Sequence, residues 1–201
     1  MELVIQTANN AFQMKSTDAD ANYSSSETLQ LGRDGASVYH HAAAIFDFSA
    51  LPAIASIYRA RLWLYVSGSH GSIASCPIYV RRCLRDIILN EFTWNSYKTG
   101  SAWDTAGALG SGTDYTTTYA VIAYAPATGS QWMNVNITAM INYIRTNFAG
   151  IAKILLLPFP GPLAGDYVDC YSSAYATDTT KRPKLIIEYN YPKNNNNIRI
   201  F

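Results

Sequence analysis

The amino-acid sequence predicts an all-β domain, a β-sandwich that carries one short helix. Three observations lead to this prediction. Short segments in which apolar and polar residues alternate recur along the whole chain. Turn-forming stretches rich in Gly, Pro, Ser, Thr and Asn separate them, which is typical of a sandwich and not of a parallel α/β sheet. Only one stretch shows sustained helical periodicity.

The clearest strand covers residues 60–66. Aliphatic side chains occupy one of its faces and long amphipathic ones the other: Ala60, Leu62, Leu64 and Val66 against Arg61, Trp63 and Tyr65. Further strands are expected over residues 1–7, 27–31, 41–48, 78–82, 119–124, 132–137, 151–157, 167–172 and 184–189.

The helix is expected to begin at residue 138, where the Thr138 side chain can cap it, and to stop at Gly150. Apolar residues recur at helical spacing between them, at Met140, Ile141 and Ile144. A second, single turn of helix fits residues 87–91.

With 201 residues, the chain fits one sandwich domain over residues 1–189, followed by an Asn-rich linker and a tip over residues 190–201. The last four residues, Ile198, Arg199, Ile200 and Phe201, alternate as a short strand would. We expect this tip to dock by strand addition, either on its own sheet or on that of a neighbour.

The formal net charge of +1 and the charged fraction of 14% argue against nucleic acid or an anionic membrane as partner. No secretory signal or membrane span is visible, so synthesis in a host cytoplasm is expected. Cys76, Cys83 and Cys170 are odd in number and lack metal-ligand spacing, which predicts buried free thiols.

No catalytic motif is visible, and we expect a protein that is not an enzyme. His40 and His41 are adjacent on a strand and point to opposite faces, whereas His70 lies in a Gly-rich loop. Asp18 and Asp20 are weak candidates for a structural metal site, with solvated loop carboxylates as the favoured interpretation.

An aromatic and basic stripe is the strongest candidate for a contact site. It is expected to contain Arg61, Trp63 and Tyr65, beside Tyr79 and Arg81. Three interpretations stay open: the stripe packs under a loop, contacts another subunit, or stacks on sugar rings. Trp94 and Trp132 are expected in the core, and five loop residues are further candidates for sugar stacking: Trp103, Tyr115, Tyr119, Tyr167 and Tyr175.

An ordered set of short motifs resembles the DNRLRE family of jelly-roll domains, which are similar to carbohydrate-binding modules. The set consists of NYS at 22–24 with TLQLG at 28–32, AIFDFSALP at 44–52, IYRARLWLY at 57–65, IYVRR at 78–82, FTWN at 92–95, WMNVNIT at 132–138, and YSS at 171–173 with RPKLIIEY at 182–189. Departures from the family pattern are Ala44 and Ile45 where an arginine is usual, Ser24 in place of glycine, and Asn136 in place of aspartate.

The resemblance implies a jelly-roll β-sandwich of two antiparallel sheets with the short helix packed on it. It implies no cofactor, and a structural calcium in a loop as the metal that best fits such a module. It also implies two functions. The first is a virion structural protein of a bacteriophage, a head-decoration (cement) protein or a fibre- or tail-associated module. Its partners would be its own copies or capsid and tail proteins. The alternative is a stand-alone, extracellular carbohydrate-binding module for an extracellular or host-surface polysaccharide.

Overall fold

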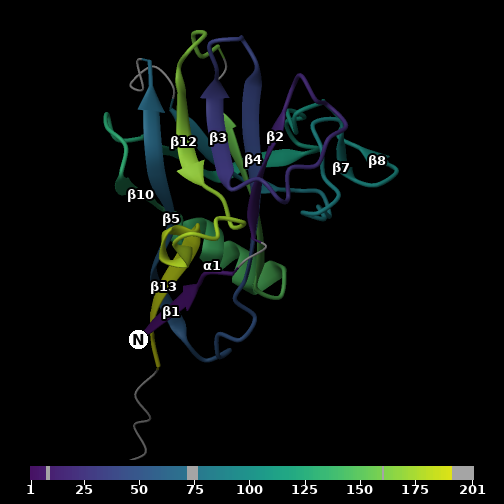
Figure 1. The fold of residues 1–201 in the computed structure, drawn as a ribbon. Helices are drawn as coiled ribbons and strands as arrows, with labels where there is room; N and C mark the ends of the chain where they lie inside the picture. Colours follow the sequence, from purple (N-terminus) through teal and green to yellow (C-terminus); the bar gives the residue numbers. More distant parts are fainter. Residues whose placement is uncertain (8–9, 72–76, 160, 192–201) are drawn as a thin grey trace, which may run out of the picture.

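The computed structural model describes residues 1–7, 10–71, 77–159 and 161–191, and its regular structure is almost entirely β (Figure 1). Within these described residues, the all-β prediction with one α-helix is confirmed. In chain order, the elements are β1 (Glu2–Ile5), β2 (Ala11–Lys15), β3 (Thr28–Arg33), β4 (Tyr39–Asp47), β5 (Ser56–His70), β6 (Ile78–Cys83), β7 (Ser96–Lys98), β8 (Ser101–Ala102), β9 (Tyr115–Ala123), β10 (Gln131–Asn136), α1 (Thr138–Asn147), β11 (Ile151–Pro158), β12 (Tyr167–Tyr171), the 3₁₀ turn η2 (Thr179–Lys181) and β13 (Lys184–Asn190).

The main sheet is antiparallel and curls into two layers. Its strand order is β1-β13-β5-β12-β3-β4-β11-β6-β9, with β10 also paired to β5 and β2 to β4. We call β1, β13, β5, β10, β12 and β3 layer A, and β2, β4, β11, β6 and β9 layer B. The layers are joined at one corner, where β3 and β4 pair only through Gly32 with His40 and Arg33 with Tyr39. The two expected sheets are therefore continuous through this corner.

An inner core fills the space between the two layers. Leu62 and Leu64 on β5 face Ile78 and Val80 on β6 across it, and all four side chains are buried. Burying a side chain of this size contributes roughly 1.5–3 kcal/mol, so the alternation along these strands fixes which face points inward.

Helix α1 packs against the inner core through Met140, Ile141 and Ile144, as their spacing predicts. The expected cap is wrong. Ile137 occupies the cap position without a side-chain hydrogen bond, and Thr138 is the first helical residue. The Thr138 hydroxyl instead accepts the N–H of Ala60 at 2.8 Å, because β5 runs directly beside the start of the helix.

Layer B is covered on its outer face as well, by the segment 84–114, which contains the β7–β8 hairpin and which we call the cover segment (Figure 1). The outer cluster between them draws on the strands through Phe12, Met14, Ala43, Leu155 and Leu157, and on the cover segment through Ile87, Leu89, Phe92, Trp103 and Ala108. Strands β4 and β11 are thus buried on both faces. The expected helix at 87–91 is a single turn, in which the Phe92 N–H donates to the Ile88 carbonyl.

Candidate functional site

The outer face of layer A carries a continuous group of aromatic and cationic side chains, which we call the aromatic–cationic face. Strand alternation builds it, because the neighbours of each buried leucine on β5 point outward. Its members are Arg61, Trp63 and Tyr65 on β5, Trp132 on β10, Tyr171 on β12, and Tyr175, Lys181 and Lys184 near β13.

The aromatic rings of this face contact one another and are partly buried. Tyr65 meets Trp132 edge-on with 5.3 Å between centroids, and Trp63 meets Trp132 in the same way at 6.1 Å. On the other side, Tyr65 stacks on Tyr171 at 5.7 Å, and Tyr171 stacks on Tyr175 at 3.7 Å. The five rings form one connected set, and such pairs each add about 0.5–1.5 kcal/mol beyond burial.

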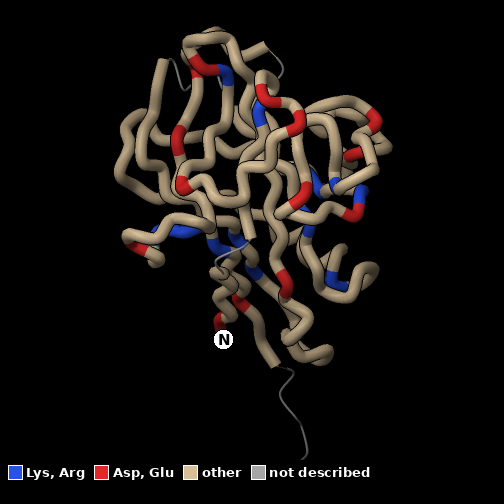
Figure 2. The backbone as a smooth tube through the Cα atoms, turned by 45° about the vertical axis from the view of Figure 1, so that its right-hand side comes forward, with Lys and Arg blue, Asp and Glu red and all other residues tan. Residues whose placement is uncertain are grey.

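Cations lie over and beside these rings. Lys184 places its ammonium 4.0 Å from the Trp132 ring centroid, and Lys181 lies 5.0 Å from that of Tyr65. Arg61 donates to the Asn134 side-chain oxygen across the β5–β10 pair at 2.9 Å. The Asp178 carboxylate beside Lys181 raises the pKa of that ammonium. In Figure 2, Lys and Arg positions gather across the middle of the molecule, above the end that carries Met1.

Two polar features of the face bear on ligand binding. The Trp63 indole N–H is buried and has no hydrogen-bond partner among the described residues. A buried donor left in this way costs roughly 1–3 kcal/mol. The neighbouring Tyr175 raises the pKa of the Tyr171 phenol, so the Tyr171 hydroxyl keeps its proton at neutral pH. The face therefore offers phenol, ammonium and guanidinium groups.

Of the five residues predicted to share a stripe, the structure brings together Arg61, Trp63 and Tyr65. Tyr79 and Arg81 lie elsewhere, on the outer face of layer B, because β6 belongs to the opposite layer. There the Arg81 guanidinium lies 4.3 Å from the Tyr79 ring centroid and 4.1 Å from that of Tyr115. The group of three on layer A and the pair on layer B point away from each other across the inner core.

The sequence interpretation placed Trp132 in the core, and this is wrong. Trp132 pairs with Tyr65 on the outside of layer A and is partly exposed. The alternation of side chains along the strand could have revealed this, since the adjacent Met133 is buried and Trp132 must then point outward. Trp94 does pack against the outer cluster, as expected. Of the loop aromatics, Trp103 and Tyr115 are buried there, Tyr175 joins the face, and Tyr119 is exposed on β9.

Tyr167 stacks on the His70 ring, with 4.2 Å between the ring centroids. His70 also bonds Asp169 at 2.9 Å. His40 bonds Asp34 at 3.1 Å, while His41 is directed to the Gly107 carbonyl on the opposite face of β4. Each imidazole thus has a local partner that holds it in place.

The two weak metal candidates are engaged with other side chains. Asp18 bonds Lys15 at 2.7 Å and accepts from the Tyr23 hydroxyl at 2.6 Å. Asp20 accepts from the Asn95 side-chain amide at 2.8 Å. Among the described residues, no group of three or more His, Cys, Asp or Glu side chains is arranged to hold a metal ion.

Cys83 and Cys170 are buried free thiols, whereas Cys76 lies outside the described residues. The tip, Ile198, Arg199, Ile200 and Phe201, also lies outside them. Within the described part of the chain, no helix is long and apolar enough to cross a membrane. Neither a family model nor a curated protein matches the sequence.

Proposed function

We propose that the chain is a non-enzymatic structural protein of a phage particle, made in the host cytoplasm and displayed on the virion surface. It would serve as a head-decoration protein or as a fibre- or tail-associated module. The observation that supports this proposal is the aromatic–cationic face, which combines Trp, Tyr, Arg and Lys on a sheet surface. Trp, Tyr and Arg are the residues most enriched at the centres of protein contacts.

The arrangement of the rings favours a protein partner. Sugars bind aromatic residues by lying flat on a free ring face. In the aromatic–cationic face, Tyr171 has a ring on each side, and Lys184 lies over Trp132. Ring edges, hydroxyls and ammonium groups are left to point outward, and these suit a flat contact with a copy of the chain or with a capsid or tail protein.

The family proposal is supported by where its motifs fall. Most segments that resemble DNRLRE domains lie on β3, β4, β5, β6, β12 and β13, and at the β10–α1 junction, whereas the motifs at 22–24 and 92–95 lie outside the strands. A motif set that coincides with strands of a curled antiparallel sheet is what a jelly-roll member would have.

Self-association of the purified protein tests the assembly proposal. We expect Trp132→Ala to weaken it roughly tenfold or more in sedimentation velocity, because a central aromatic anchor contributes at least about 2 kcal/mol to a contact. Tyr58→Ala is the matched control, since Tyr58 is 53% exposed on the same strand as Tyr65. Equal association of the two variants would contradict the proposal.

The alternative is a carbohydrate-binding module for an acidic extracellular or host-surface polysaccharide. It is favoured by the cations beside the tyrosine hydroxyls, because Arg can hold a uronate carboxylate through two hydrogen bonds. Affinity electrophoresis in gels containing alginate tests it. Retardation that is lost in Lys184→Gln but kept in Lys98→Gln, on β7 of the cover segment, would favour this function.

A further inference from the structure

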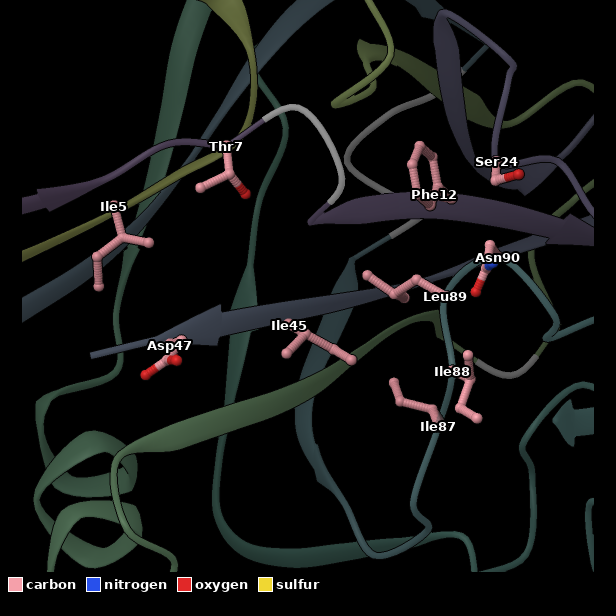
Figure 3. A pocket seen from close by; sticks show the side chains of 10 residues that line it. All are labelled: Ile5, Thr7, Phe12, Ser24, Ile45, Asp47, Ile87, Ile88, Leu89 and Asn90. Atoms are coloured by element: carbon pink, nitrogen blue, oxygen red, sulfur yellow. The ribbon is translucent and has the colours of Figure 1, made fainter. Parts of the chain in front are cut away.

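A groove of about 630 Å³ opens where the end of β1 approaches β4 and the cover segment (Figure 3). Apolar side chains line its middle, among them Ile45, Ile87 and Leu89. Asp47 lies at one end beside Ile5, and Ser24 and Asn90 lie at the other. The groove is therefore an apolar channel with an acidic end, and Ile88 on its wall is 37% exposed.

A buried side chain beside this groove lacks a partner. Asn10 is 2% exposed, and neither its carboxamide oxygen nor its nitrogen has a hydrogen-bond partner among the described residues. The Asn10 main chain extends the pairing of β2 with β4 by one residue, since its carbonyl accepts the Ile45 N–H at 2.7 Å. Residue 10 then lies on the same face as Phe12, which lines the groove. The Asn10 carboxamide is buried and does not itself line the groove, so the features that suit a peptide segment are the apolar lining and the Asp47 carboxylate.

The chain itself contains a segment of matching chemistry. Residues 198–201 read Ile-Arg-Ile-Phe, with apolar side chains for the channel and one cation for the Asp47 carboxylate. Residues 191–197 precede them and can span roughly 24 Å when extended. An extended segment that inserts its side chains into such a channel gains affinity from main-chain pairing and specificity from its side chains.

The direction of β13 favours a second copy as the source of the segment. Ile5 at the groove pairs with Leu185, and β13 continues past that pair to Asn190 at the other end of β1. The chain thus runs away from its own groove, and its own tip would have to reverse to return. A tip from a second copy needs no reversal.

We propose that residues 198–201 of one copy occupy the groove of another, with Arg199 paired to Asp47. This inference rests on the proposed assembly function and names the contact that would link the copies. It uses a surface distinct from the aromatic–cationic face, which lies on layer A.

Disulfide trapping between separately purified variants tests this. In a Cys76→Ser background, one variant carries Ile88→Cys and the other Ile200→Cys. We expect a linked dimer on non-reducing gels only when the two are mixed and oxidised. Replacing Ile88→Cys by Leu163→Cys, at a position that is 66% exposed and does not line the groove, is the matched control and should reduce linking roughly tenfold.

A charge exchange makes the test specific. Asp47→Lys or Arg199→Asp alone should slow linking several-fold, and the two together, one on each partner, should restore it. Equal linking by the control, or a bond formed only within one chain when both cysteines are present, would overturn the proposal. Trp132→Ala should leave linking intact. The linking assay therefore tests the contact between the tip and the groove separately from the contact through the aromatic–cationic face.

Discussion

Acidification is expected to weaken the attachment of the cover segment to layer B through one imidazole. His41 on β4 is 3% exposed, and its Nδ1 lies 2.8 Å from the Gly107 carbonyl oxygen of the cover segment. Because a carbonyl only accepts, Nδ1 carries the hydrogen, and the neutral ring packs at 4.6 Å from Trp94. Burial lowers the pKa of His41 from 6.5 to about 4.

The size of the effect follows from this shift. Between pH 6.5 and pH 4 the unfolded chain binds a proton that the folded protein does not, so the free energy of unfolding falls as the pH falls through this window. A shift of about 2.5 units corresponds to about 3 kcal/mol in full. Between pH 7 and pH 5, His41 alone should account for a loss of about 2 kcal/mol.

Urea unfolding followed by tryptophan fluorescence at pH 7, 6 and 5 measures this. His41→Gln should be less stable at pH 7 but should lose about 2 kcal/mol less than the wild type on acidification. Trp94→Phe is the matched control, because it disturbs the same packing and keeps the imidazole, so its pH dependence should equal that of the wild type. His40 is also buried with a lowered pKa and contributes equally to all three proteins. Parallel pH profiles for the wild type and His41→Gln would refute the assignment.

Three further predictions concern the cover segment and the thiols. Gly107 has φ +80°, and a Cβ there would lie 2.7 Å from the Trp94 ring, so Gly107→Ala should lower the free energy of unfolding in urea by about 2–4 kcal/mol. Gly100 has φ +72° but open space around it, so Gly100→Ala should lower it by about 1 kcal/mol. Asp114 is fully buried, and its carboxylate accepts hydrogen bonds from the backbone N–H groups of residues 104, 105 and 110 and from the Arg85 side chain. Asp114→Asn should therefore lower the free energy of unfolding by about 2–4 kcal/mol and speed hydrogen exchange at those three amides, whereas Asp104→Asn, at a more exposed position, should do neither. Burial raises the pKa of Cys83 to about 12 and that of Cys170 as well, so in a Cys76→Ser variant alkylation should be at least roughly 100-fold slower in buffer than in urea; equal rates would contradict the burial of both thiols.

The sequence predicted the fold class and the inner core well, because alternation is a local signal. Each buried leucine on β5 fixes the orientation of its neighbours, and so Arg61, Trp63 and Tyr65 were placed together correctly. Which strands share a layer is not a local property. Tyr79 and Arg81 alternate in the same way, but the curl of the sheet carries β6 to the opposite layer.

The second covered face was missed for a similar reason. Burial on both faces produces a continuous apolar run such as that of β11. The same run is also expected of a sandwich strand that lies next to a helix, so the sequence alone does not separate the two cases. Tyr171, Tyr175 and Lys181 enter the aromatic–cationic face from a distant part of the chain, through the pairing of β12 with β5. Only long-range pairing could reveal them. The outward orientation of Trp132, in contrast, could have been inferred from the sequence, because Trp132 alternates with the apolar Met133 along the strand.

The cover segment has one more consequence, for how the protein opens and how it can change. Among the described residues, its apolar contacts are mainly with the outer face of layer B, whereas the inner core is sealed by the two layers and α1. It can therefore detach as a local unit of unfolding while the sandwich persists. A protease could then nick residues 84–114 while the two layers stay paired, and insertions or exchanges there would alter the outer surface of layer B without touching the inner core.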